Sequence, residues 1–282
     1  MHRLVSGVIL IDILSCLVAL ASPAVAQPAA ELSNEMIEIT YAPPNRPGLK
    51  PIYEYMKEKH FLEQLKQFLS PLKLPVPLRI TMLECGVTNS FWESRAQGLK
   101  LCYEWPDWVA RLAPAERTET GIPREDVIVG SFVQVALHEL GHGMFDIYDV
   151  PLFGREEDAA DQMAGFIMTQ FGRQTARRLL PGTAYFWAAD DQPWPHDWFS
   201  DEHGNPRQRA YNYLCIAYGA YKDEFQDFVD GGLLAKDRAD KCEHEFVVLR
   251  NAFAKTIYPH IDPEKMKIVQ SRDWLADFYP AK

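Results

Sequence analysis

The sequence predicts an α+β fold, with an N-terminal lobe built on a mixed or antiparallel sheet with helices and a mainly helical C-terminal lobe. Two observations predict it. Segments in which apolar and polar residues alternate, as in strands, end by residue 103. Long segments with apolar residues at the spacing of a helical face begin near residue 123 and dominate the rest of the chain. Strands and helices that are separated in this way along the chain are typical of α+β proteins.

Residues 1–26 have the pattern of a secretory signal peptide. A short basic region and an apolar run are followed by Ala24-Val25-Ala26, which predicts cleavage before Gln27. Asp12 within the apolar run disfavours a permanent membrane anchor, because a carboxylate in hydrocarbon is costly. A lipoprotein cleavage site at Cys16 is the minor alternative, since too little apolar sequence precedes it. We therefore expect a secreted or periplasmic protein without stable membrane insertion.

Four cysteines remain in the mature chain, Cys85, Cys102, Cys215 and Cys242. Disulfides are the natural use of an even number of cysteines in an exported protein. Four cysteines allow three pairings, and proximity in the sequence favours Cys85 with Cys102 and Cys215 with Cys242.

Charge and composition exclude two classes of partner. Lys and Arg number 29 against 39 Asp and Glu, and the net charge is −10, so neither nucleic acids nor anionic membranes are expected partners. No apolar run after the signal approaches the length of a membrane span. The mature chain is long enough for one domain with two lobes, or for two small domains, and we place the two parts at residues 27–143 and 144–282.

The N-terminal lobe is expected to contain strands and one helix. Residues 38–41 alternate like a strand that two prolines end. Residues 52–69 have apolar side chains at helical spacing and are expected to form one amphipathic helix, ended by Pro71. Three further strands are expected at residues 78–83, 89–92 and 99–103.

The strongest motif in the chain is an H-E-x-x-H formed by His138, Glu139 and His142. It lies in an apolar periodic segment that is expected to be a helix, beginning at Pro123 and ending at Gly143. On a helix the two histidines lie on one face, where both imidazoles can bind one tetrahedral metal ion. Glu139 can then reach a water on that metal without being a ligand. The competing interpretation is an amphipathic core helix with two incidental histidines.

After the motif, helices are expected at residues 155–171, closed by Gly172, and at residues 207–221 and 234–257. Residues 185–199 are dense in Trp, Phe, Pro and Asp and are expected to be non-helical. Core packing under a loop is the default interpretation of the aromatic residues there, and the lining of a cleft is the alternative. These residues are Tyr185, Phe186, Trp187, Trp194, Trp198 and Phe199.

A catalytic zinc usually takes three protein ligands. The metzincin spacing for a third histidine is not met, because Tyr148 stands at that position. Acidic residues at the start of the helix 155–171 lie on the same face as its apolar residues, so they are expected to point into the protein. Burying a carboxylate costs free energy unless a cation balances its charge. On spacing and facing, Glu157 is the preferred third ligand, while Glu156 and Asp161 are the reserve candidates. The competing interpretation is that these acidic side chains are solvated in the first turn, where they interact favourably with the helix dipole.

The pattern Glu157-x-x-x-Asp161 resembles the E-x-x-x-D element of the gluzincins, the thermolysin and neprilysin group. This resemblance implies that Glu157 binds zinc and that Asp161 orients a ligand histidine through its other ring nitrogen. Such a contact fixes the tautomer of the histidine and raises its basicity as a ligand.

The mature chain also resembles a family of exported bacterial proteins described as metallopeptidases, the DUF4344 type. The segments that carry the resemblance are Cys85-Gly86, Leu101-Cys102-Tyr103-Glu104, HELGH, GREEDAADQ at 154–162, Asp201-Glu202-His203 with Gln208-Arg209, and Tyr213-Leu214-Cys215. The resemblance implies a zincin-like fold with a metal site.

The motifs together predict an exported zinc-dependent metallopeptidase that acts on peptides or proteins and binds one Zn²⁺ per chain. His138, His142 and Glu157 are the expected ligands, and Glu139 is the expected general base. The alternative is a catalytically inactive binding protein with a zincin fold. A di-iron oxidase is set aside, because that architecture needs a second E-x-x-H and the chain has none.

A peptidase also needs a donor that stabilises the oxyanion of the tetrahedral intermediate. His203 is the candidate, since its acidic neighbours can keep the imidazole charged; a surface histidine in a turn is the competing interpretation. His196 and Tyr148 are weaker rivals. Arg209 is expected to be a buried partner of one of the two acids beside His203, Asp201 or Glu202.

Overall fold

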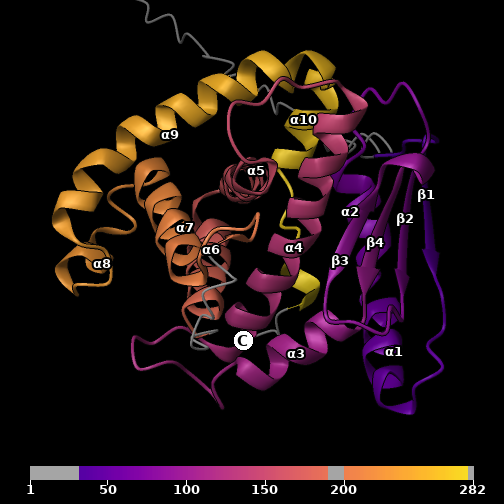
Figure 1. The fold of residues 1–282 in the computed structure, drawn as a ribbon, viewed down its shortest axis with the longest axis horizontal. Helices are drawn as coiled ribbons and strands as arrows, with labels where there is room; N and C mark the ends of the chain where they lie inside the picture. Colours follow the sequence, from indigo (N-terminus) through magenta and orange to yellow (C-terminus); the bar gives the residue numbers. More distant parts are fainter. Residues whose placement is uncertain (1–31, 190–199, 279–282) are drawn as a thin grey trace, which may run out of the picture. The chain divides into compact units, whose positions relative to one another are not determined.

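A four-stranded mixed sheet forms one side of the N-terminal half (Figure 1). The structure, a computed structural model, describes residues 32–189 and 200–278. The strands are β1 Ile37–Tyr41, β2 Leu78–Leu83, β3 Ser90–Glu93 and β4 Gly98–Cys102, in the order β1-β2-β4-β3. β1, β2 and β4 run parallel, whereas β3 lies at the edge and pairs antiparallel with β4. All four predicted strands are present, and the sheet is mixed.

The prediction of a single helix at residues 52–69 is wrong, because two helices occupy this region, α1 Lys50–Glu58 and α2 Phe61–Phe68. His60 separates them in a left-handed conformation, with φ of 51°. The Leu62 amide at the start of α2 donates to the Tyr41 hydroxyl of β1 at 2.7 Å. That bond satisfies one of the amide groups that the start of a helix leaves without an intrahelical partner.

The long helix α4, Arg124–Ile147, is the centre of the fold. It lies between the sheet and the later helices (Figure 1), and α3, Glu104–Leu112, leads into it. The predicted helix end at Gly143 is wrong, since α4 continues to Ile147. A Cβ at Gly143 would lie 2.9 Å from the Trp92 ring, so this glycine permits close packing of the helix against β3. Pro123 is the residue before the helix and not its first residue.

Six helices follow within the described chain: α5 Glu156–Gln170, α6 Arg173–Ala189, α7 Pro206–Ala220, α8 Gln226–Asp230, α9 Lys236–Thr256 and α10 Pro263–Gln270. The predicted positions of α5, α7 and α9 agree with the structure to within two residues at each end. Short 3-10 helices are described at Pro47–Leu49, Ser94–Ala96, Tyr258–His260 and Ala276–Phe278.

Helix α6 corrects the prediction that residues 185–199 are non-helical. Residues 185–189 belong to this helix, and the Phe186 and Trp187 side chains are buried in the core. Pro181 and Gly182 lie inside α6. A Cβ at Gly182 would be 2.0 Å from the Asp126 carbonyl oxygen, so the glycine lets α6 approach the backbone of α4. The predictions for Trp194, His196, Trp198 and Phe199 lie outside the described residues, as do those for the signal peptide.

Both disulfides have the predicted pairing. Cys85, just after β2, is bonded to Cys102 at the end of β4, and Cys215 of α7 is bonded to Cys242 of α9. Across residues 32–189 and 200–278, none of the helices has both the length and the apolar character needed to cross a bilayer. Residues 32–282 form one compact unit, and the assignment of two lobes within it stays a prediction.

Candidate metal centre

Helices α4 and α5 bring His138, His142 and Glu157 together. The Nε2 atoms of the two histidines are 3.3 Å apart, and they lie 3.0 Å and 3.4 Å from Glu157 Oε2. The helices can approach this closely because α4 has Gly141 at the contact, where a Cβ would lie 3.2 Å from Ala160 of α5. The three predicted ligands thus form one cluster, with one donor atom from each within 4.8 Å of the others.

Each histidine meets a second carboxylate at its other ring nitrogen. His138 Nδ1 lies 2.9 Å from Asp161 Oδ1, and His142 Nδ1 lies 2.8 Å from Glu156 Oε1. With both Nδ1–H groups donating to carboxylates, the two Nε2 atoms face the cluster. Glu156, a reserve candidate for the third ligand, therefore contacts the outer nitrogen of His142 in this structure.

Asp161 is buried at the centre of a hydrogen-bonded network. It accepts two bonds from Arg209, from Nε at 2.6 Å and Nη2 at 2.7 Å, and one from the Tyr213 hydroxyl at 2.9 Å. Gln134 Nε2 donates to the Tyr213 hydroxyl at 2.8 Å and approaches Asp161 to 3.2 Å. The network fixes the Asp161 carboxylate and, through it, the His138 ring.

Arg209 is therefore not the partner of Asp201 or Glu202 that the sequence predicted. Its guanidinium pairs with Asp161 and lies 3.6 Å over the Trp187 ring. Burial alone would raise the pKa of Asp161, but the positive charge of Arg209 and the His138 contact hold it below its ordinary range. Asp161 therefore stays ionised.

His203 lies beside the cluster, on the segment that precedes α7. Its Nε2 is 3.0 Å from Glu157 Oε2, and its Nδ1 is 2.8 Å from Asp201 Oδ1. The bond to Glu157 raises the pKa of His203 against the opposite effect of burial, and the Asp201 contact raises it further. Tyr148 lies elsewhere: its ring stacks on His260 and its hydroxyl donates to the Lys73 carbonyl.

The charges of the cluster suit a cation. Burial alone would raise the pKa of Glu157, but hydrogen bonds from His138, His142 and His203 lower it far below its ordinary value. Burial lowers the pKa of His142, yet bonds to Glu157 and Glu156 raise it to about 9 overall. Three imidazoles thus converge on one carboxylate oxygen. Two imidazole nitrogens and a carboxylate oxygen are a common donor set of catalytic zinc, so these residues fit that metal.

Glu139 is buried next to the cluster and borders a cavity of about 240 Å³. Burial raises the pKa of its carboxyl toward neutral pH, as suits a general base. The other walls come from the β2–β3 loop, α3 and α6, with Thr88, Asn89, Trp105, Trp108 and Trp187 among the lining residues. Glu139 and His203 line the same cavity.

Sequence reasoning missed Gln134 and the two tryptophans of α3. Gln134 precedes His138 by one helical turn, so the same face of α4 carries both. Helical spacing could have identified it. Trp105 and Trp108 could not be placed, because α3 itself was not predicted.

A second group of metal-binding residue types in the described chain comprises Cys85, Cys102 and Glu104. Its cysteines are joined in a disulfide, which leaves no thiolate to bind a metal.

One family model matches the chain. It is DUF4344, described as "Putative metallopeptidase", and it matches residues 41–257. This range contains all the residues of the cluster, together with Glu139 and His203. No curated protein and no solved structure matches the chain. Because the family model spans well over half of the sequence, the protein belongs to the DUF4344 metallopeptidase family.

Proposed function

We propose that the protein is an exported, zinc-dependent peptidase with a zincin-like active site of the gluzincin type. One observation carries the proposal: His138, His142 and Glu157 converge beside the buried carboxylate of Glu139, at the edge of a cavity. Membership of a metallopeptidase family supports a peptide substrate.

One zinc ion per chain would be held by His138 Nε2, His142 Nε2 and a Glu157 oxygen. When bound, zinc supplies a Lewis acid that lowers the pKa of water to about 7 and polarises a carbonyl group. Asp161 and Glu156 hold the two imidazoles with their Nε2 atoms toward Glu157. The protein thus prepares the donor geometry before the metal arrives.

Glu139 takes the proton from the attacking water and delivers it to the leaving amine. It suits this role because it borders the cavity and because burial raises the pKa of its carboxyl. The His203 imidazolium is the donor to the oxyanion of the tetrahedral intermediate, through the Nε2–H that contacts Glu157 in this structure. Asp201 at its Nδ1 and the raised pKa favour the charged form of His203.

The edge strand β3 is the candidate to pair with an extended peptide substrate. This strand is at the sheet edge and packs against α4, where Trp92 Nε1 donates to Asp146 at 3.0 Å. Thr88 and Asn89, just before β3, line the cavity beside Glu139. An edge strand leaves backbone donors and acceptors for an added strand, so a substrate paired with β3 would present its carbonyl to the cluster.

The test is hydrolysis of a peptide library by zinc-loaded mature protein, with two variants beside it. Glu139→Gln should abolish turnover while retaining zinc, because Glu139 is not a ligand. His203→Ala should retain zinc and lower kcat by about 10²–10³, the usual effect of removing an oxyanion donor. Turnover by Glu139→Gln would remove it as the base. Stoichiometric zinc without turnover of any peptide by the wild type would favour a binding protein with a zincin fold.

A further inference from the structure

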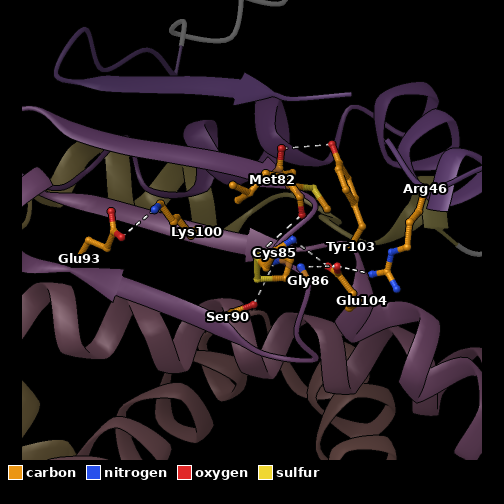
Figure 2. The surroundings of a disulfide bond; sticks show 11 residues. Arg46, Met82, Cys85, Gly86, Ser90, Glu93, Lys100, Tyr103 and Glu104 are labelled. Atoms are coloured by element: carbon orange, nitrogen blue, oxygen red, sulfur yellow. Dashed lines mark hydrogen bonds and ion pairs between the residues drawn. A yellow bond between two sulfur atoms is a disulfide. The ribbon is translucent and has the colours of Figure 1, made fainter. Parts of the chain in front are cut away.

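Glu104 is a buried carboxylate outside the metal cluster, at the first position of α3. It accepts hydrogen bonds from the backbone amides of Cys85 at 3.1 Å and Gly86 at 2.8 Å, each on a different oxygen. The Arg46 guanidinium also contacts it. Figure 2 shows these groups next to the Cys85–Cys102 disulfide.

The two amides belong to the loop that forms one wall of the cavity. Gly86 turns the chain with a φ of 78°, and Thr88 and Asn89 then line the cavity. At the far end of the loop, the buried Ser90 hydroxyl accepts a bond from the Cys102 amide at 3.4 Å. The disulfide and Glu104 therefore fix the start of the loop, and β3 fixes its end.

The residues that follow Glu104 form another wall of the same cavity. Trp105 and Trp108 of α3 line it together with Thr88 and Asn89. The ring centroids of the two tryptophans are 5.3 Å apart, in an edge-to-face arrangement. Glu104 is thus the point at which the loop wall and the helix wall are joined.

We propose that Glu104 is a positioning residue for peptide binding, which sets the β2–β3 loop against α3 so that the two walls hold the substrate. The proposal rests on the peptidase function proposed above. Glu104 acts through the loop and touches neither the cluster nor the substrate. It should therefore affect substrate binding and leave the chemical step almost unchanged.

A carboxylate is needed here for a chemical reason. Each of its two oxygens accepts a backbone N–H, and the charge is matched by Arg46. A glutamine has one acceptor oxygen, and its NH₂ group would meet an N–H that has lost its partner. Glu104→Gln keeps the size of the side chain but cannot accept hydrogen bonds from the Cys85 and Gly86 amides on two oxygens.

Glu84 provides a matched control. It also contacts Arg46, through Nε at 3.0 Å, and it accepts the backbone amides of Asn45 at 2.6 Å and Arg46 at 3.0 Å. Those amides lie in the β1–α1 connection, which does not line the cavity. Glu84 is the first residue of the β2–β3 loop, and both amides donate to its Oε2 alone, so a glutamine oxygen can still accept both. Glu84→Gln thus removes the charge opposite Arg46 but keeps the backbone contacts.

The experiment compares wild type, Glu104→Gln and Glu84→Gln in the full mature protein loaded with zinc. Hydrogen–deuterium exchange at residues 86–92 should rise at least about tenfold in Glu104→Gln, because the loop opens more easily. KM for a peptide substrate should rise about tenfold with kcat within about twofold, since an interaction common to ground and transition states is lost. Zinc content should stay at the wild-type value. Glu84→Gln should change none of these.

Equal exchange and equal KM in the two variants would overturn the proposal, as would a loss confined to kcat. If Glu104→Gln does not fold, Glu104→Asp replaces it. The shorter acid keeps the charge near Arg46 but cannot reach both amides. It should therefore also raise KM. Absence of turnover in the wild type would refute the peptidase function, and the exchange measurement would still decide whether Glu104 fixes the loop.

Discussion

Asp161→Asn should be among the most destabilising isosteric changes in the protein. Asp161 is 7% exposed and pairs with Arg209, which is 6% exposed, through two hydrogen bonds. An asparagine offers one acceptor oxygen and no charge, so the buried guanidinium loses its counter-ion. Removing one partner of a buried ion pair typically costs about 3–5 kcal/mol. The same change leaves His138 Nδ1 facing a neutral amide oxygen in place of a carboxylate, and disruption of such a contact usually lowers metal affinity by about 10–100-fold.

Asp158→Asn is the matched control on the same helix. Asp158 pairs with Arg155 at the surface, where both side chains are about half exposed, and exposed pairs contribute little because water and salt screen them. The free energy of unfolding should be measured by urea denaturation of the zinc-free proteins, so that metal binding does not enter the comparison. Zinc affinity should then be measured by competition with a chromophoric chelator. A free energy for Asp161→Asn within about 1 kcal/mol of that for Asp158→Asn would refute the buried-pair argument.

Two further predictions follow from the cluster and the disulfides. Zinc uptake at pH 8 should release protons, because the pKa of His142 is raised to about 9 and a ligand imidazole must be neutral. The number of protons released should fall as the pH rises through 9. Titration calorimetry in buffers of different ionisation enthalpy measures it. Serine at Cys85 and Cys102 should raise KM as well as lower stability, whereas serine at Cys215 and Cys242 should only lower stability, by about 2–4 kcal/mol. An equal KM in the two double variants would contradict the separate role of the first disulfide.

The convergence of His138, His142 and Glu157 was predictable because the spacing of the residues within each helix is local. Two histidines four residues apart share a helical face wherever the helix lies, and Glu157 lies in the first turn of the helix that packs against that face. The disulfide pairings followed from proximity in the sequence, and each strand followed from a short segment of the chain.

The remainder depended on contacts between distant segments. Pro181 and Gly182 are local signals against a helix, yet the glycine is what allows α6 to reach the backbone of α4. Gly143 is a typical helix end, yet the Trp92 ring requires a glycine inside α4. The partner of Arg209 was misassigned because two acids lie near it in the sequence, whereas Asp161 lies opposite it in the fold. Tertiary packing overrides local preference in each case.

We propose that His138, His142 and Glu157 hold one metal ion. The most direct test is elemental mass spectrometry of natively purified mature protein, with Glu157→Ala and Glu156→Ala beside it. We expect about one zinc per wild-type chain and a loss of about tenfold or more in Glu157→Ala. The loss should be much smaller in Glu156→Ala, because the Glu156 carboxylate contacts the outer nitrogen of His142. No zinc in the wild type even after reconstitution, or a greater loss in Glu156→Ala, would contradict it.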